Sequence, residues 1–266
     1  MSYFADGHRG AAIIATCTLA SENGLAGDTQ HAMARLIAHH WGRSGLCAGF
    51  PDEAPDEAFL DQIALALQGN ISRLRQVGHN VIFAMLALKA FKAVPQAITP
   101  SRVEGVCRLI RSFATYDDVT LTEDDHYPDL ADPATFAASV LEECLAAAER
   151  FRGTGNGYPG HLLTYGQALL ELRSLGYPDL AEAGIHAYQL FVKVARQGPT
   201  PDARRIPDHA DRGQDPLTHG YWEQRGQGDP RLGHCFKYPY SFHNLLARAS
   251  DPQLTRRCLA IAHLLF

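Results

Sequence analysis

Apolar residues recur along most of this 266-residue chain with the three-to-four-residue period of an α-helix. Ala, Leu, Arg and Glu fill the periodic segments, and the β-branched alternation typical of strands is scarce. The pattern therefore predicts an all-α protein built from helix pairs, each an apolar helix, a turn with Pro or Gly, and a more polar helix. The predicted pairs are 11–20 with 29–41, 81–92 with 101–113, 162–175 with 179–196, and 234–249 with 253–265, and single helices are expected at 56–67 and 133–151.

The dipeptide Gly-His precedes the apolar helix of every pair. It occurs at Gly7-His8, Gly78-His79, Gly160-His161 and Gly233-His234. With 23 Gly and 13 His in the chain, chance would give about one such dipeptide, so four of them indicate an internal repeat. The repeat units begin near residues 7, 78, 160 and 233.

Stacked helix pairs of this kind form an α/α solenoid or close into a toroid-like ring, and we expect one such domain over residues 1–266. The apolar first helices should line its centre, and the second helices, which carry more charge, should face outward. Residues 197–232 are rich in Gly, Pro, Asp and Arg and have no apolar period. We expect a long loop there, of the kind that often covers a functional site.

Composition narrows the class of protein. The net charge of −5 argues against nucleic acid as a partner, because phosphate binding requires a basic face. No apolar run approaches the roughly 20 residues of a membrane span, so no membrane association is expected. The six cysteines include no CxxC pair. Four of them lie in apolar helical stretches, Cys17, Cys107, Cys144 and Cys258; we interpret them as buried free thiols of a reducing compartment and expect a cytoplasmic location. Motifs for nucleotide binding, for HExxH zinc sites and for serine hydrolases are missing from the sequence.

The histidines of the four dipeptides carry the candidate chemistry. A histidine at a helix N-terminus lies near the positive end of the helix dipole, which favours the neutral ring that a metal ligand or a general base needs. If the repeat brings the helix starts together, His8, His79, His161 and His234 form one metal site. The alternative is that each Gly-His dipeptide merely begins a helix and its ring bonds a backbone group.

Two further residues follow His234 on the predicted fourth apolar helix. Lys237 lies one turn after it, where the amine would join the metal ligands after carboxylation by CO2, or act as a catalytic group with a lowered pKa. The alternative for Lys237 is a surface side chain that extends its amine into water. His243 is a second candidate catalytic residue on the same helix.

Three segments resemble the questin oxidase-like family. They are His161-Leu-Leu-Thr-Tyr-Gly-Gln-Ala-Leu-Leu-Glu171, the similar run that begins at His79, and His234-x-x-Lys237. Members of that family carry short histidine-led apolar helices and a late His-x-x-Lys, and they are associated with oxidation of polycyclic aromatic polyketides. The resemblance implies a non-haem iron held by His8, His79, His161 and His234, with Lys237 as a carboxylated ligand.

These observations favour a non-haem metal oxygenase, with iron as the expected metal, that acts on a small aromatic molecule and O2. Two other functions stay open from the sequence. One is a metal-free lyase or hydrolase that uses the histidines as acid and base groups. The other is a non-catalytic helical-repeat binding module.

Overall fold

The computed structural model describes residues 3–43, 45, 49–116, 119–125, 127–128, 130–207, 215–225 and 233–266. Its α-helices are α1 (Tyr3–Glu22), α2 (Gly27–Trp41), α3 (Leu60–Gln68), α4 (His79–Ala93), α5 (Pro100–Ser112), α6 (Pro133–Arg150), α7 (Tyr158–Ser174), α8 (Pro178–Gln197), α9 (His219–Arg225), α10 (His234–Ala249) and α11 (Pro252–Ile261). Short 3-10 turns lie at Glu57–Phe59, Gln76–Gly78, Pro95–Ala97 and Ala262–Leu264. These residues include no β-strand, which confirms the all-α class. None of the helices described here could span a membrane.

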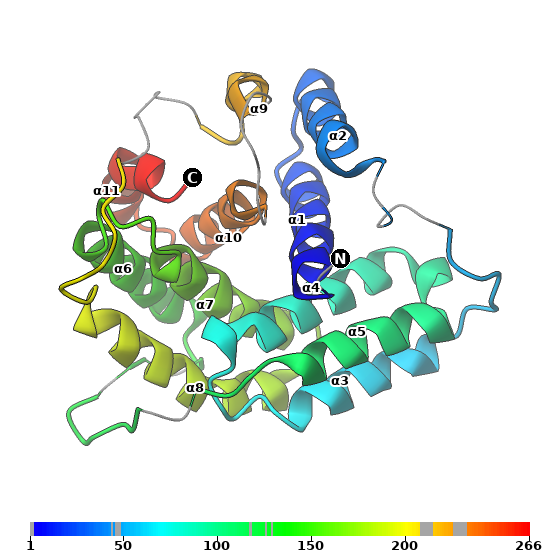
Figure 1. Ribbon diagram of the computed structural model, residues 1–266, viewed down its shortest axis with the longest axis horizontal. Coiled ribbons are helices and arrows are strands. Elements are labelled where there is room, and N and C mark those ends of the chain that lie inside the picture. The colour runs from blue at the N-terminus through cyan, green and yellow to red at the C-terminus, as the bar shows by residue number, and fades with distance from the viewer. Residues whose placement is uncertain are drawn as a thin grey trace.

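Four helices form a closed ring at the centre of the molecule. Helix α1 contacts α4, α4 contacts α7, α7 contacts α10, and α10 contacts α1 (Figure 1). These are the predicted first helices of the four pairs. In α4 every residue from His79 to Leu88 is buried, and in α7 every residue from Pro159 to Leu172. Burial on all sides of α4 and α7 agrees with the prediction for these two helices, whereas α1 keeps a partly exposed face.

The other helices surround this ring and bury one face each. Helix α5 packs on α4, α8 packs on α7, and α6 lies against both α7 and α10. Helices α2 and α9 lie side by side at the top of Figure 1. In α5 the buried face is Val103, Cys107 and Ile110, the spacing expected of an outer helix with one apolar stripe. The predicted toroid-like or solenoid order of the helix pairs stays a prediction.

Close approach between the ring helices explains the glycine of every Gly-His dipeptide. A methyl group at Gly78 would lie 2.2 Å from Tyr165, and one at Gly160 would lie 2.2 Å from Tyr238. In each case the clashing residue follows the histidine of the next ring helix by four positions. The same spacing relates Gly233 to Ala12, which would lie 2.6 Å from the methyl group, and Gly7 to Phe83, at 3.2 Å, although Leu109 of the outer helix α5 is nearer to Gly7, at 2.6 Å. The repeat therefore preserves a helix-to-helix contact as well as a histidine.

Two of the four dipeptides do not begin a helix, contrary to the prediction. His79 and His234 are first residues of α4 and α10, each preceded by a glycine in the left-handed conformation. Gly7-His8 lies inside α1, and His161 is the fourth residue of α7, which begins at Tyr158 with Pro159 in its first turn. The sequence pattern missed these starts because proline fits the first turn of a helix, and because a glycine inside a helix costs only about 1 kcal/mol.

Two smaller expectations also change. The predicted loop at 197–232 contains helix α9, whose Trp222 is fully buried. Residues 208–214 and 226–232 of the predicted lid lie outside the described residues. Cys17, in an apolar stretch of the sequence, is exposed on α1. The free thiols of Cys107, Cys144 and Cys258 are buried as expected.

A charged layer joins the ring helices near their C-terminal ends. Lys89 of α4 pairs with Glu22 of α1 at 2.6 Å and with Glu171 of α7. Glu171 also pairs with Arg248 of α10 and accepts a hydrogen bond from Asn244 at 3.2 Å. Because two cations neutralise two carboxylates, the nearly buried Glu171 is compensated on several sides. The layer lies ten or fourteen residues beyond the histidines, which shows that the four helices run parallel.

A pair of Gly→Ala substitutions tests the close approach. Gly160→Ala should destabilise the protein by about 1–3 kcal/mol, because the new methyl group overlaps the Tyr238 ring. Gly10→Ala is the matched control inside α1, where no atom lies within 4 Å of the new methyl, and should stabilise by about 0.5–1 kcal/mol. Urea unfolding measures both. Equal effects of the same sign would contradict the packing described here.

Candidate metal centre

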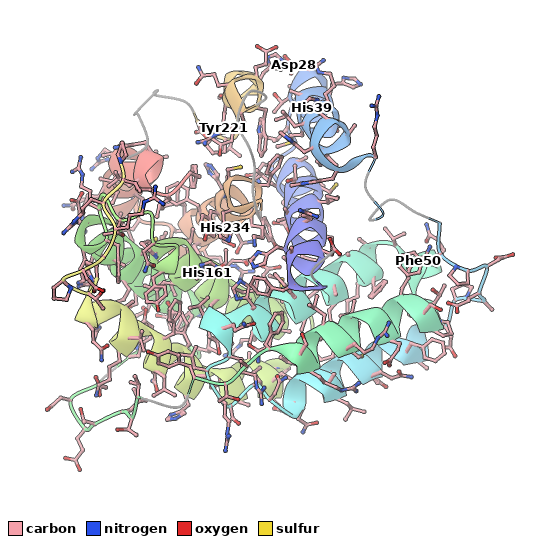
Figure 2. All side chains as sticks on the ribbon, viewed as in Figure 1. Asp28, His39, Phe50, His161, Tyr221 and His234 are labelled. Carbon is pink, nitrogen blue, oxygen red and sulfur yellow. The ribbon has the colours of Figure 1, made fainter. Side chains whose placement is uncertain are left out.

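The four histidines of the Gly-His dipeptides meet at one end of the ring. The centroids of neighbouring imidazoles are 4.5 Å apart for His8 and His79, 4.7 Å for His79 and His161, 5.0 Å for His161 and His234, and 5.3 Å for His234 and His8. The imidazoles of His8 and His161, which are not neighbours in this order, have centroids 6.5 Å apart. Figure 2 shows His161 and His234 side by side near the centre of the molecule. His8, His79 and His161 are at most 6 % exposed, whereas His234 is half-buried. We call this group the histidine ring.

Backbone carbonyls fix the tautomers of two of its members. His79 Nδ1 contacts the carbonyl oxygen of Gln76, and His161 Nδ1 lies 2.7 Å from that of Gly157. Because a carbonyl oxygen only accepts hydrogen bonds, Nδ1 must carry the proton in both rings. Each Nε2 atom is then left with an unprotonated lone pair.

These two lone pairs face each other. His79 Nε2 and His161 Nε2 are 3.1 Å apart, and neither has a hydrogen to donate to the other. Two acceptors at this distance repel unless a cation lies between them. With metal–nitrogen bonds of about 2.0–2.1 Å, a 3.1 Å separation corresponds to an angle of about 95–100° at a shared ion. The pair thus has the spacing of two ligands of one metal.

A proton is a poor candidate for that cation. Burial, reinforced by the charge of Lys237, lowers the pKa of His161 to about 3 and that of His234 to about 2. Burial also lowers the pKa of His79 and of His8. All four rings are therefore neutral near pH 7, which is the state that binds a metal.

Lys237 lies directly against the histidine ring. Its Nζ contacts His8 Nδ1 and lies 5.6 Å from the centroid of Phe83, and the residue is 2 % exposed. Burial lowers the pKa of this amine to about 7, so the neutral form is accessible. A neutral amine can accept a hydrogen bond from His8 Nδ1, which leaves the lone pair of His8 on Nε2. The alternative reading of Lys237 as a surface residue is wrong.

Within the histidine ring two more nitrogens are buried without a hydrogen-bond partner among the described residues, Nε2 of His8 and Nε2 of His234. An unpartnered buried nitrogen costs about 1–3 kcal/mol unless something else satisfies it. As the side chains stand, the described residues contain no group of three or more His, Cys, Asp or Glu arranged to hold a metal. The Nε2 atoms of His79 and His161 have ligand spacing; His8 and His234 supply two further free nitrogens in imidazole rings that adjoin them.

Tyr238 supports two members of the histidine ring. Its ring stacks on His234, with centroids 4.9 Å apart and planes at 12°, and its Oη lies 3.2 Å from His161 Nδ1. Since that nitrogen already donates to Gly157, the Tyr238 hydroxyl is left to donate to the same carbonyl, 3.5 Å away. The sequence offered one clue to this role, because Tyr238 lies one turn after His234 on the same helix face.

Three phenylalanines enclose the histidine ring on the side of His8 and His79, away from Tyr238. Phe4 lies 4.6 Å from the His8 ring, Phe83 lies 5.3 Å from the His79 ring, and Phe113 lies 5.8 Å from the His79 ring. This apolar wall keeps water from His8 and His79 and strengthens electrostatic interactions there. Because His234 is the most exposed of the four histidines, approach from solvent is on its side.

The turn before His79 is strained. Gln76 and Val77 have φ of 38° and 56°, two of the three positive values among non-glycine residues in the described chain. Such conformations cost about 1–3 kcal/mol each, and most for a β-branched residue. It is this turn that presents the Gln76 carbonyl to His79.

His243 lies apart from the histidine ring, nine residues beyond His234 on α10. Its Nε2 is 3.3 Å from Asp215 Oδ1, and its ring packs against Phe242. The structure thus brings together His8, His79, His161, His234 and Lys237, and it places His243 elsewhere on the same helix. The catalytic role of His243 stays a prediction. No sequence pattern pointed to the carbonyls of Gln76 and Gly157, because any residue supplies a carbonyl and only the backbone conformation directs it.

Comparison of the chain with protein families, with characterised proteins and with solved structures finds no match. The resemblance to the questin oxidase-like family therefore stays a prediction, and the candidate function rests on the geometry of the histidine ring.

Buried neutral histidines predict acid sensitivity of the metal-free protein. Between pH 6.5, the ordinary pKa of histidine, and about 3, the unfolded chain binds a proton at His161 that the folded protein does not. The contribution of His161 to stability is therefore full above pH 6.5 and is lost as the pH drops, by about 1.4 kcal/mol per pH unit. Urea unfolding at pH 6 and pH 4 should show a shallower fall in His161→Gln than in the wild type. Parallel curves for the two proteins would contradict this prediction.

Proposed function

We propose that this protein is a non-haem metal enzyme whose histidine ring holds the metal, and that it acts as an oxygenase on a small aromatic molecule. The main observation in favour of a metal is that His79 Nε2 and His161 Nε2, two hydrogen-bond acceptors, lie only 3.1 Å apart. The buried, unpartnered Nε2 atoms of His8 and His234 support it as further ligands. Imidazole nitrogen suits iron, copper, nickel and zinc, and iron is the metal we expect.

A bound metal of this kind would bind O2 and activate it for reaction with substrate. The protein's own groups supply the surroundings. The Gln76 and Gly157 carbonyls orient His79 and His161, and the three phenylalanines exclude water from one side. Lys237 Nζ, in contact with His8 Nδ1, can take up or release a proton beside the centre. Carboxylation of Lys237 by CO2, which the family resemblance implies, would add an oxygen ligand to the four nitrogens.

Metal content is the first test. Protein purified without a histidine tag should contain about one equivalent of metal by elemental analysis, and His161→Ala should lose it, because His161 supplies one of the two facing nitrogens. His186→Ala is the matched control, an exposed histidine on the outer helix α8, and should keep the metal. Wild-type protein that neither contains metal nor takes up added Fe²⁺ would overturn the proposal.

Oxygen consumption tests the reaction class. The iron-loaded protein, supplied with a panel of hydroxylated aromatic compounds, should consume O2 with at least one of them, and His161→Ala should not. A metal-bound protein that consumes no O2 but cleaves or eliminates from a substrate would indicate the lyase or hydrolase. If the metal-free protein binds one of these compounds as tightly as the metal-loaded protein and neither converts it, the protein would be the non-catalytic binding module.

A further inference from the structure

We propose that the strained turn Arg75–Gly78 is a positioning device for His79: the Arg75 side chain clamps the turn so that the Gln76 carbonyl stays on His79 Nδ1. The inference rests on the proposed function only where it concerns metal affinity. Its first consequence is the tautomer of His79, which exists without any metal.

The strain lies where the carbonyl is aimed. Gln76, Val77 and Gly78 have φ of 38°, 56° and 90°, three successive residues in the left-handed region. Gly78 must be glycine, since a methyl group there would meet the Tyr165 ring at 2.2 Å. At Val77 the positive φ is unfavourable, because β-branched residues disfavour the left-handed region. A relaxed turn would move the Gln76 carbonyl away from His79.

Contacts on both sides of the turn hold it in place. The Arg75 guanidinium donates to the carbonyl oxygen of Phe113 at 2.6 Å, and Arg75 also forms an isolated β-bridge with Thr115. On the near side Tyr116 N–H donates to Leu74 O, and Gly78 N–H donates to Arg75 O, each at 2.8 Å. The bond between Gly78 and Arg75 closes the turn itself. The others join it to the segment after α5, which also carries the Phe113 ring that lies beside His79.

The bond from Arg75 to Phe113 affects which nitrogen of His79 carries the proton. With the Gln76 carbonyl in place, His79 keeps its proton on Nδ1 and turns a bare Nε2 toward His161. Without it, a proton on Nε2 could bond to His161 Nε2, and the His79 lone pair would be lost to the metal. Partners that orient a ligand from behind typically change metal affinity by about 10–100-fold when they are removed.

The test uses Arg75→Met, which keeps the aliphatic stem and removes the bond to Phe113. Nitrogen-15 spectra of the metal-free protein should show His79 protonated on Nδ1 in the wild type and a mixture of tautomers in the variant. Co²⁺ is the metal probe, because its visible absorption reports histidine ligation. Arg75→Met should bind Co²⁺ about 10–100-fold more weakly than the wild type.

Two further variants separate clamping from general damage. Arg73→Met is the matched control, an exposed arginine two residues earlier, and should leave both the tautomer and Co²⁺ affinity unchanged. Val77→Gly in the Arg75→Met background should restore most of the affinity, because glycine adopts positive φ without strain. If Arg75→Met does not fold, Arg75→Gln carries the same test with a smaller shift expected.

Each outcome decides the matter. A folded Arg75→Met protein whose His79 remains fully on the Nδ1 tautomer overturns the inference, and so does a double variant in which Val77→Gly restores nothing. A tautomer shift in a protein whose wild type binds no Co²⁺ supports the positioning role and counts against the proposed metal function. The two proposals therefore fail separately.

Discussion

Close contact between the ring helices is the constraint on which the rest of this structure depends. At three of the four contacts a glycine lets the next helix approach until a side chain one turn after its histidine fills the space of the missing methyl group; at Gly7 Leu109 of α5 shares that space with Phe83. The histidine beside each glycine is thereby carried to the same end of the ring. Four helices that meet in this way place four imidazoles within contact of one another, which no single helix could do. The convergence is a product of backbone packing rather than of attraction between the rings.

That packing creates an electrostatic problem that the protein alone does not solve. The rings are buried and neutral, and two of them are locked by carbonyls with their lone pairs facing. Burial opposes a proton between them, because a charged imidazolium would lose its hydration. The metal ion that we propose would remove this conflict, since it would accept both lone pairs. The strained backbone of Val77 also costs stability, and we propose that this conformation orients His79.

At the opposite end of the four ring helices the charged groups pair with one another. There Glu22, Lys89, Glu171 and Arg248 compensate one another within the protein, so this layer is complete without a ligand. The ring helices thus carry two polar layers separated by apolar turns, one balanced internally and one not. The contrast locates the candidate site at the histidine end. It also supplies a reason for the parallel order, because the pairs of the balanced layer hold the helices in register along their length.

The sequence by itself determined the helical class, the fourfold repeat and four of the residues that meet, because periodicity and the Gly-His dipeptide are local patterns. It also pointed to Lys237, one turn from His234. It misplaced the helix starts at His8 and His161, where a proline and a tolerated glycine masked the boundary. Only the tertiary structure decided that Lys237 is buried against His8, that Tyr238 stacks on His234, and that backbone carbonyls fix the tautomers. The first depends on packing that brings together two segments 229 residues apart in the chain, as Lys237 and His8 show. The others are local contacts that depend on the exact backbone and side-chain conformations, which the residue pattern does not encode.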